Sequence, residues 1–132
     1  MRTQSIVVDS NVFIDNLRGL ESARRFFDSV RNDSSLSVCY SAITEAELLS
    51  GKECENEEKV DRILELLSIG EKILVTNEIA KSAGAIRRKY NLTLLDSLIA
   101  ATALSTRGIL YSGNIGAFKA IPNLETKEPY KN

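Results

Sequence analysis

Apolar residues recur along the chain in two alternating patterns, one typical of buried strands and the other of amphipathic helices. Short apolar runs predict strands at residues 5–8, 36–40, 72–75 and 109–112. The longer segments between them carry apolar residues at spacings of three, four and seven, which predicts helices. The helix predicted from Glu21 to Arg31, for example, has an apolar face formed by Ala23, Phe26, Phe27 and Val30.

The order of these elements determines the expected fold class. Two helical segments separate each strand from the next, so consecutive strands can be joined by right-handed crossovers. This order predicts an α/β fold, in which a mostly parallel central sheet lies between layers of helices. With 132 residues, the chain is expected to form a single domain over residues 1–132 that folds without a disulfide or a metal.

Glycine and polar residues mark the expected ends of several elements. Gly19 and Gly51 stand where two helices are expected to stop, and Gly108 stands at the turn before the last of the four strands. Residues 124–126 are a possible edge strand. The remaining tail, residues 127–132, is expected to be frayed.

The most apolar helical segment, residues 93–104, carries an acid in its first turn. Its apolar residues fall on nearly every side of the helical wheel, which is typical of a helix buried among other elements. The Asp96 carboxylate would then need a compensating charge, a metal or several hydrogen-bond donors. Helix capping is the alternative, because Thr93 and Asp96 have the spacing of a capping box. For this acid alone, capping is the better interpretation.

Two further acids occupy similar places in the pattern. Thr44 and Glu47 repeat the capping-box spacing at an apolar run, and Asp9 directly follows the first predicted strand. In α/β sheets, the carboxyl ends of the strands and the adjoining helix starts share one edge, where ligands bind. The three acids could therefore converge on one cleft at this edge.

Composition restricts the chemistry that such a cleft could perform. The chain has no histidine, which removes Ser-His, Cys-His and His-His acid–base systems and argues against a zinc site. The formal charge is -1, with 17 basic and 18 acidic residues, so any nucleic-acid binding must come from local patches. The glycine-rich nucleotide motifs are also missing. Carboxylates with hard metal ions are the chemistry that remains.

The sequence also predicts the compartment. No apolar run reaches the roughly 18 residues of a membrane span, and the N-terminus enters a strand instead of a signal sequence. Cys39 and Cys54 form no spacing motif and are expected to be reduced thiols. We therefore expect a cytoplasmic protein that does not associate with membranes.

Three segments resemble the signature segments of PIN-domain nucleases, and in particular those of VapC-type toxins of toxin–antitoxin pairs. They are residues 9–15 (DSNVFID), 41–51 (SAITEAELLSG) and 95–103 (LDSLIAATA). The resemblance implies a compact three-layer α/β/α sandwich and RNA cleavage that depends on Mg²⁺ or Mn²⁺. It also implies a homodimer and a partner antitoxin whose tail blocks the active groove.

The resemblance also assigns candidate site residues. Asp9, Glu47 and Asp96 match the acidic metal ligands of the family, and Asn114 stands at a fourth position that is often Asp. The Asn114 amide oxygen can bind a metal or hold the attacking water, but it adds no charge. One-metal and two-metal sites therefore both stay open. Ser112 stands where threonine is frequent in the family.

The residues around these acids have less specific expectations. Ser10 and Asn11 either steady Asp9 by hydrogen bonding or form an ordinary turn, and Asp15 and Glu45 are expected to lie outside the ligand set. Candidate residues for holding the substrate strand are Arg18, Arg24, Arg25, Arg87, Arg88 and Lys119.

The expected function is hydrolysis of RNA by a metal-activated water, which leaves 5′-phosphate and 3′-hydroxyl ends. One alternative is a catalytically weak PIN-fold module that binds RNA or an antitoxin, which Asn114 would favour. The other is a phosphatase of the haloacid-dehalogenase kind. That chemistry needs a second acid two residues after Asp9, where this chain has Asn11.

Overall fold

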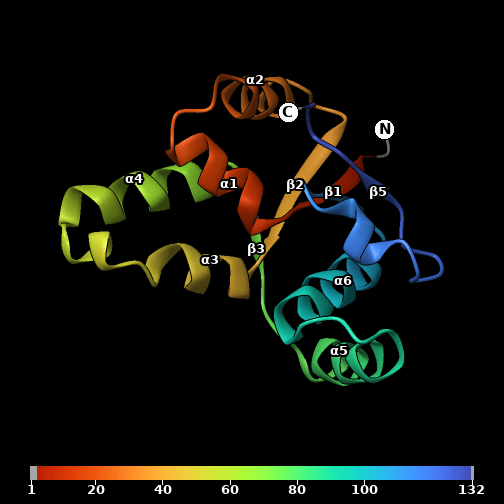
Figure 1. The fold of residues 1–132 in the computed structure, drawn as a ribbon. Coiled ribbons are helices and arrows are strands. Elements are labelled where there is room, and N and C mark those ends of the chain that lie inside the picture. The colour runs from red at the N-terminus through yellow and green to blue at the C-terminus, as the bar shows by residue number, and fades with distance from the viewer. Residues whose placement is uncertain (1–2, 132) are drawn as a thin grey trace.

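The strands form one parallel sheet at the centre of the molecule (Figure 1). The computed structural model describes residues 3–131. Its strands are β1 (Gln4–Val8), β2 (Leu36–Ser41), β3 (Glu71–Ile73), β4 (Ile109–Tyr111) and β5 (Thr126–Lys127). Its α-helices are α1 (Ser10–Leu17), α2 (Glu21–Arg31), α3 (Ala42–Leu49), α4 (Glu57–Leu67), α5 (Asn77–Tyr90) and α6 (Leu94–Thr106). Two short 3-10 helices are η1 (Lys52–Glu55) and η2 (Ile115–Phe118).

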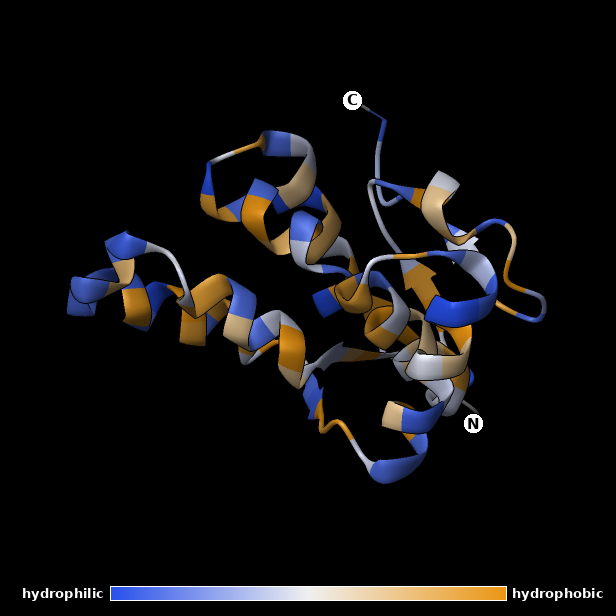
Figure 2. Ribbon diagram, turned by 60° about the horizontal axis from the view of Figure 1, so that its bottom comes forward, coloured by the Kyte–Doolittle hydropathy of each residue, from blue (hydrophilic) through white to orange (hydrophobic). Residues whose placement is uncertain are grey.

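Helices cover both faces of the sheet, which confirms the predicted α/β/α sandwich. Successive strand residues point to opposite faces, so Ile6 and Val8 pack into one core and Val7 into the other. The first core also contains apolar residues of α1, α2, α3 and α4, whereas the second contains those of α5 and α6. Figure 2 shows hydrophobic residues concentrated in the central strands and along the helices. No helix within residues 3–131 combines the length and the apolar character needed to cross a membrane.

The strand order reverses beside β1, where a ligand-binding crevice is expected. The sheet runs β3-β2-β1-β4-β5, so the chain builds outward on one side of β1 and then returns to build on the other side. Such a reversal leaves room between the carboxyl ends of the two strands that flank it, and ligands bind there in open α/β sheets. Here those strands are β1 and β4, with Val8 paired to Tyr111. The residues that follow them are Asp9 and Ser112.

The start of α3 at Ala42 agrees with the helix predicted over about residues 42–50, but the place of Glu47 in this helix differs from the prediction. The Ser41 hydroxyl accepts a hydrogen bond from the Ile43 N–H at 3.1 Å and caps the helix, which therefore begins at Ala42. Thr44 is fully buried within the helix, and Glu47 lies in its last turn. The expectation that Glu47 stands at the start of a helix was wrong, because the capping residue is three positions earlier than the Thr44 pattern suggested.

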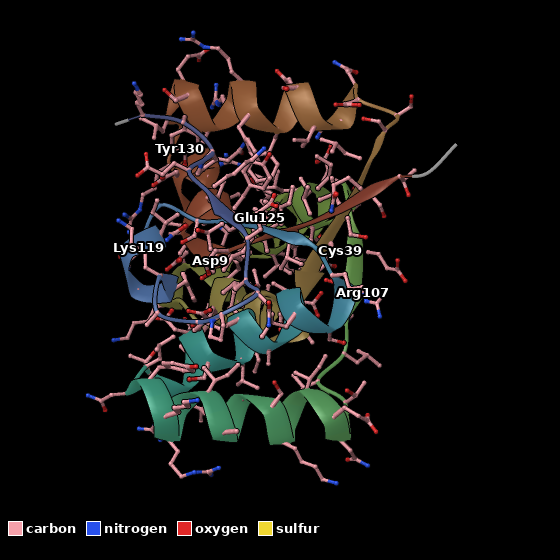
Figure 3. All side chains as sticks on the ribbon, turned by 90° about the vertical axis from the view of Figure 1, so that its right-hand side faces the viewer. Asp9, Cys39, Arg107, Lys119, Glu125 and Tyr130 are labelled. Atoms are coloured by element: carbon pink, nitrogen blue, oxygen red, sulfur yellow. The ribbon has the colours of Figure 1, made fainter. Side chains whose placement is uncertain are left out.

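The C-terminal segment is also ordered where fraying was expected. The edge strand β5 pairs with β4 through Lys127, later than predicted. The Tyr130 hydroxyl donates a hydrogen bond to Asp15 Oδ2 at 2.6 Å, and its ring lies beside Phe26, beneath α2 (Figure 3). The prediction of a frayed tail was wrong for residues 127–130, because these contacts fix the segment to α1 and α2. Residue 132 lies outside the described residues.

Two glycines have distinct roles at the ends of helices. Gly19 adopts a φ of 88° just after α1, which confirms the predicted helix stop. After α6, the left-handed residue is instead Arg107, with a φ of 54°. Gly108 lies in a tight space, because a Cβ there would lie 3.1 Å from Thr106 Oγ1, 3.2 Å from the Ser5 carbonyl oxygen and 3.3 Å from Val7 Cγ2.

Candidate active site

Asp9 lies buried at the crevice between β1 and β4. It is the N-cap of α1, and its Oδ1 accepts a hydrogen bond from the Ser10 N–H at 2.8 Å. Its other oxygen, Oδ2, accepts a hydrogen bond from the Ser112 hydroxyl at 2.9 Å. Its backbone N–H donates to the Tyr111 carbonyl oxygen at 2.9 Å, which continues the β1–β4 pairing. Only 6% of the Asp9 surface is exposed, so its carboxylate depends on these donors.

A hydrogen-bond network joins the two sides of the crevice. The Asn114 N–H donates to the Ser112 hydroxyl at 3.0 Å, and the Gly113 N–H donates to Asn11 Oδ1 at 3.2 Å. Ser112 is itself fixed from the sheet edge, since its N–H donates to the Lys127 carbonyl oxygen at 3.1 Å. Of the two residues expected to steady Asp9, Ser10 bonds to its carboxylate, whereas the Asn11 side chain bonds to the chain that follows β4.

The three acids influence one another electrostatically. Burial raises the pKa of Asp9, hydrogen bonds from Ser112 and Ser10 oppose that increase, and the negative charge of Asp96 adds to it. Burial also raises the pKa of the half-buried Glu47, and the charges of Asp9 and Asp96 raise it further. The negative charges of the three acids therefore act on one another, with Asp9 at the end of β1, Glu47 in the last turn of α3 and Asp96 in the first turn of α6.

The capping interpretation of residues 93–96 holds for Thr93 and for the backbone of Asp96. The Thr93 hydroxyl accepts a hydrogen bond from the Asp96 N–H at 3.1 Å, so Thr93 caps α6. This bond uses the backbone of Asp96 and not its side chain. Within residues 3–131, no hydrogen bond or ion pair engages the Asp96 carboxylate, which is half-buried. Capping by Thr93 and a separate role for the carboxylate are therefore compatible.

The donor set suits a hard divalent cation, although the side chains are not gathered around one point. In residues 3–131, no three His, Cys, Asp or Glu side chains lie close enough together to hold a metal ion. The ion pairs of this region lie elsewhere and join Arg25 to Glu21, Arg31 to Asp28 and Lys72 to Glu45. No described cationic side chain thus neutralises Asp9, Glu47 or Asp96. Mg²⁺ and Mn²⁺ prefer oxygen ligands, and negative charge that no cationic side chain compensates attracts them.

The two extra acids have structural partners, in agreement with their expected place outside the ligand set. Glu45 Oε2 forms an ion pair with Lys72 Nζ at 3.2 Å, which links α3 to β3. Asp15 accepts the hydrogen bond from Tyr130. Burial and the Asp15 carboxylate raise the pKa of Tyr130, so this hydroxyl stays protonated and continues to donate.

One candidate basic residue lines a cavity with Glu47, and a second lies at the same end of the molecule as Asp9. Arg18 lines a cavity that Glu47 also lines, between α1, α3 and α4. Lys119 follows η2 and lies at the same end of the layers as Asp9, opposite Arg107 (Figure 3). Both are exposed, so their charges are available to a ligand.

The other candidate basic residues are placed differently. Arg24 lines a separate cavity between α1, α2 and α4, and Arg25 pairs with Glu21 at 3.7 Å. Arg87 and Arg88 lie in the last turn of α5, where their charges complement the helix dipole.

Two basic residues of the cavity beside Glu47 were missed from the sequence. Lys59 and Arg62 project from α4 and line this cavity with the buried Ile63. Their spacing of three and four residues places all three on one helix face. This spacing was visible in the sequence, but nothing in it indicates that the face is turned toward Glu47.

Comparisons with known proteins find similar sequences and similar folds. The family model described as "PIN domain" matches residues 6–123. The chain is 37% identical over 103 residues to "Ribonuclease VapC10" of Mycobacterium tuberculosis, covering 74% of each. It superposes on a "Toxin-antitoxin complex from Klebsiella pneumoniae" with a TM-score of 0.78 and 28% identity, covering 96% of this chain and 99% of that one. VapBC-1 from nontypeable Haemophilus influenzae shares the fold, with a TM-score of 0.81, 20% identity and coverage of 97% and 100%.

Proposed function

This chain belongs to the PIN domain family, and we propose that it is an endoribonuclease that acts as the toxin of a toxin–antitoxin pair. The observation that carries the proposal is the buried Asp9 carboxylate at the β1–β4 crevice, which shares an electrostatic field with Glu47 and Asp96 and has no described cationic partner. The name of the related "Ribonuclease VapC10" supports RNA as the substrate.

In this proposal, Asp9, Glu47 and Asp96 hold Mg²⁺ or Mn²⁺, and Asn114 completes the site. The cation would supply Lewis-acid activation of water and would neutralise charge on the phosphate. Groups of the chain itself orient the Asp9 carboxylate. The Ser112 hydroxyl holds one oxygen of Asp9 and the Ser10 N–H holds the other. The exposed Asn114 side chain can accept a hydrogen bond through its oxygen or donate one through its nitrogen, toward the cation or the attacking water.

The proposed partners follow from the relatives. A solved structure with 28% identity is described as a toxin–antitoxin complex, which supports an antitoxin as the protein partner of this chain. We further propose that the protein is cytoplasmic, that residues 1–132 act as one domain, and that two copies form a homodimer. An antitoxin that placed an arginine among the three acids would compete with the cation for the same charges.

The two alternatives differ from this proposal in specific residues. Asn114 favours a module that binds RNA or antitoxin but cleaves weakly, because a neutral amide contributes less to holding a cation than a carboxylate does. For a haloacid-dehalogenase-like phosphatase, the position of the second acid is occupied by Asn11. Its amide oxygen accepts a hydrogen bond from the Gly113 backbone, which is a structural contact that offers no acid chemistry.

An RNA-cleavage assay tests the proposed function. The purified chain is incubated with single-stranded RNA in Mg²⁺, in Mn²⁺ and in EDTA, and the ends of the products are determined. The proposal predicts cleavage with either cation, none in EDTA, and 5′-phosphate with 3′-hydroxyl ends. Cleavage that persists after exhaustive chelation, or products with 2′,3′-cyclic phosphates, would falsify it. Binding without cleavage under any cation would favour the weak-module alternative.

A further inference from the structure

Two parts of the chain hold the Asp9 carboxylate, and each holds a different oxygen. The Ser10 N–H, at the start of α1, donates to Oδ1, and the Ser112 hydroxyl, just after β4, donates to Oδ2. A further bond joins the same two parts, from the Gly113 N–H to Asn11 Oδ1 on α1. The direction of the Asp9 carboxylate therefore depends on how α1 is placed relative to the chain after β4.

The C-terminal segment, residues 126–130, contacts both of these parts. The Lys127 carbonyl oxygen accepts a hydrogen bond from the Ser112 N–H at 3.1 Å, which continues the pairing of β5 with β4. The Tyr130 hydroxyl donates to Asp15 Oδ2 on α1 at 2.6 Å. Because the two contacts come from one short segment, they join α1 to the chain after β4 a second time.

The contact made by Tyr130 is well supported by its surroundings. The side chain is half-buried, and its ring lies edge-on to Phe26 of α2, with the ring centres 6.4 Å apart. Burial and the Asp15 carboxylate raise the pKa of Tyr130, so its hydroxyl remains a donor. Figure 3 shows Tyr130 and Asp9 toward the same end of the molecule, opposite Arg107. Removal of the hydroxyl alone leaves the packing of the ring in place.

We propose that Tyr130 is a positioning residue for RNA cleavage, which acts through Asp15 and α1 to direct the Asp9 carboxylate. The proposal rests on the proposed function, because Asp9 must take part in the reaction for its direction to affect the rate. Without the Tyr130 hydroxyl, α1 is held less firmly relative to β4, and the carboxylate departs from the direction that the reaction needs. A small misplacement of a reacting group slows the chemical step. Tyr130 therefore affects kcat and not KM.

Amide hydrogen exchange, measured by NMR in EDTA, tests this positioning without RNA or a cation. The reporters are the N–H groups of Ser112 and Gly113, because one bonds to the C-terminal segment and the other bonds to α1. Tyr130→Phe should make both amides exchange about tenfold faster, beyond the change that its lower global stability causes throughout the protein. The slowest-exchanging amides of the core measure that global change.

The matched control is Thr76→Ala. The Thr76 hydroxyl caps α5, where it accepts a hydrogen bond from the Ile79 N–H at 3.2 Å, so its loss also destabilises the protein. The cap contacts neither α1 nor the C-terminal segment. After the same correction for global stability, the Ser112 and Gly113 amides of this variant should exchange as they do in the wild type.

RNA cleavage at saturating Mn²⁺ tests the effect on the reaction. Tyr130→Phe should lower kcat about tenfold and leave KM within about twofold of the wild-type value. Asp15→Asn keeps an oxygen that accepts the Tyr130 hydroxyl, so it should cleave at close to the wild-type rate. Asp15→Ala should lower kcat as Tyr130→Phe does, and the double variant should be no slower than either, because all three lack the same contact. Thr76→Ala should change neither constant.

Several results would overturn the proposal. One is exchange of the Ser112 and Gly113 amides in Tyr130→Phe at the wild-type rate after correction, or equal acceleration in Thr76→Ala. Another is a change in KM alone, which would mean that Tyr130 contacts RNA directly. A kcat for Asp15→Asn as low as that for Asp15→Ala would also contradict it. If the wild type does not cleave RNA, the proposed function fails, but exchange in EDTA still decides whether Tyr130 fixes α1 to the chain after β4.

Discussion

Replacing Ser112 with alanine removes the hydroxyl that joins Asp9 to the chain after β4. Ser112 is fully buried, donates to Asp9 Oδ2 at 2.9 Å and accepts from the Asn114 N–H at 3.0 Å. A hydrogen bond to a charged group contributes about 1.5–3 kcal/mol to stability. Asn114 is exposed, and its N–H can bind water when the Ser112 hydroxyl is removed. Most of the lost stability therefore comes from the missing hydrogen bond to Asp9. We expect Ser112→Ala to lower the free energy of unfolding by about 2 kcal/mol at neutral pH.

This loss should depend on pH in a definite direction. Burial raises the pKa of Asp9 in the folded protein, which means that the buried ionised carboxylate costs stability. Protonation relieves this cost, so the contribution of Asp9 to the stability of the wild type increases as the pH falls through that pKa. The Ser112 bond partly opposes this shift, so its removal raises the pKa of Asp9 further. The effect of Ser112→Ala is therefore largest where Asp9 is ionised. It should fall to about 1 kcal/mol or less where the carboxyl is protonated in both proteins.

Urea denaturation in EDTA measures both values, the first at about pH 8 and the second at the lower pH below which the cost of the substitution no longer changes. The matched control is Ser41→Ala, because Ser41 is also fully buried and its hydroxyl also accepts a backbone N–H, at 3.1 Å. Loss of this helix cap should cost about 1 kcal/mol at both pH values. If Ser112→Ala had the same cost at both pH values, the proposed stabilisation of ionised Asp9 by Ser112 would be refuted.

Three further substitutions test other parts of the account. Asn114→Asp should bind Mn²⁺ more tightly by calorimetry and cleave RNA faster at low Mn²⁺. Tighter Mn²⁺ binding with slower cleavage would show that Asn114 acts as a hydrogen-bond donor. No change in Mn²⁺ affinity or in cleavage rate would remove Asn114 from the site. Tyr130→Phe should lower the free energy of unfolding by about 1–2 kcal/mol, because the bond to Asp15 is lost; an unchanged urea midpoint would contradict the ordered tail. Asp96→Asn should abolish cleavage and leave apo stability equal or higher, whereas a loss above about 1 kcal/mol would favour a capping role.

Local sequence patterns were sufficient to predict most of the fold. Strand runs and helical periodicities depend on neighbouring residues, and the α2 boundaries at Glu21 and Arg31 agree with the prediction. The position of Asp9 followed from the rule that ligands bind at strand ends, since it comes directly after β1. The place of Glu47 in α3 was harder to predict because Ser41 and Thr44 are both good caps. Packing decides between them, as Thr44 is buried and its hydroxyl has no hydrogen-bond partner in the described chain.

Features that depend on contacts distant in sequence could not be predicted. The bond from Tyr130 to Asp15 joins residues at opposite ends of the chain. The cavity beside Glu47 is formed where α1, α3 and α4 meet. The sequence therefore could not show that Lys59 and Arg62 line the same cavity as Glu47. Sequence patterns show which face of a helix is apolar, but they do not show which other helix or strand packs against that face.

The central claim is that Asp9, Glu47 and Asp96 form one cation site although their side chains are not gathered around a common point. Calorimetric titration of Mn²⁺ into the wild type and into Asp9→Asn, Glu47→Gln and Asp96→Asn tests it most directly. Glu45→Gln is the matched control, since Glu45 is on the same helix as Glu47 but pairs with Lys72. The account predicts that each of the three substitutions weakens Mn²⁺ binding by more than about tenfold, whereas the control binds like wild type. Unchanged affinity in any of the three, or an equal loss in the control, would contradict it.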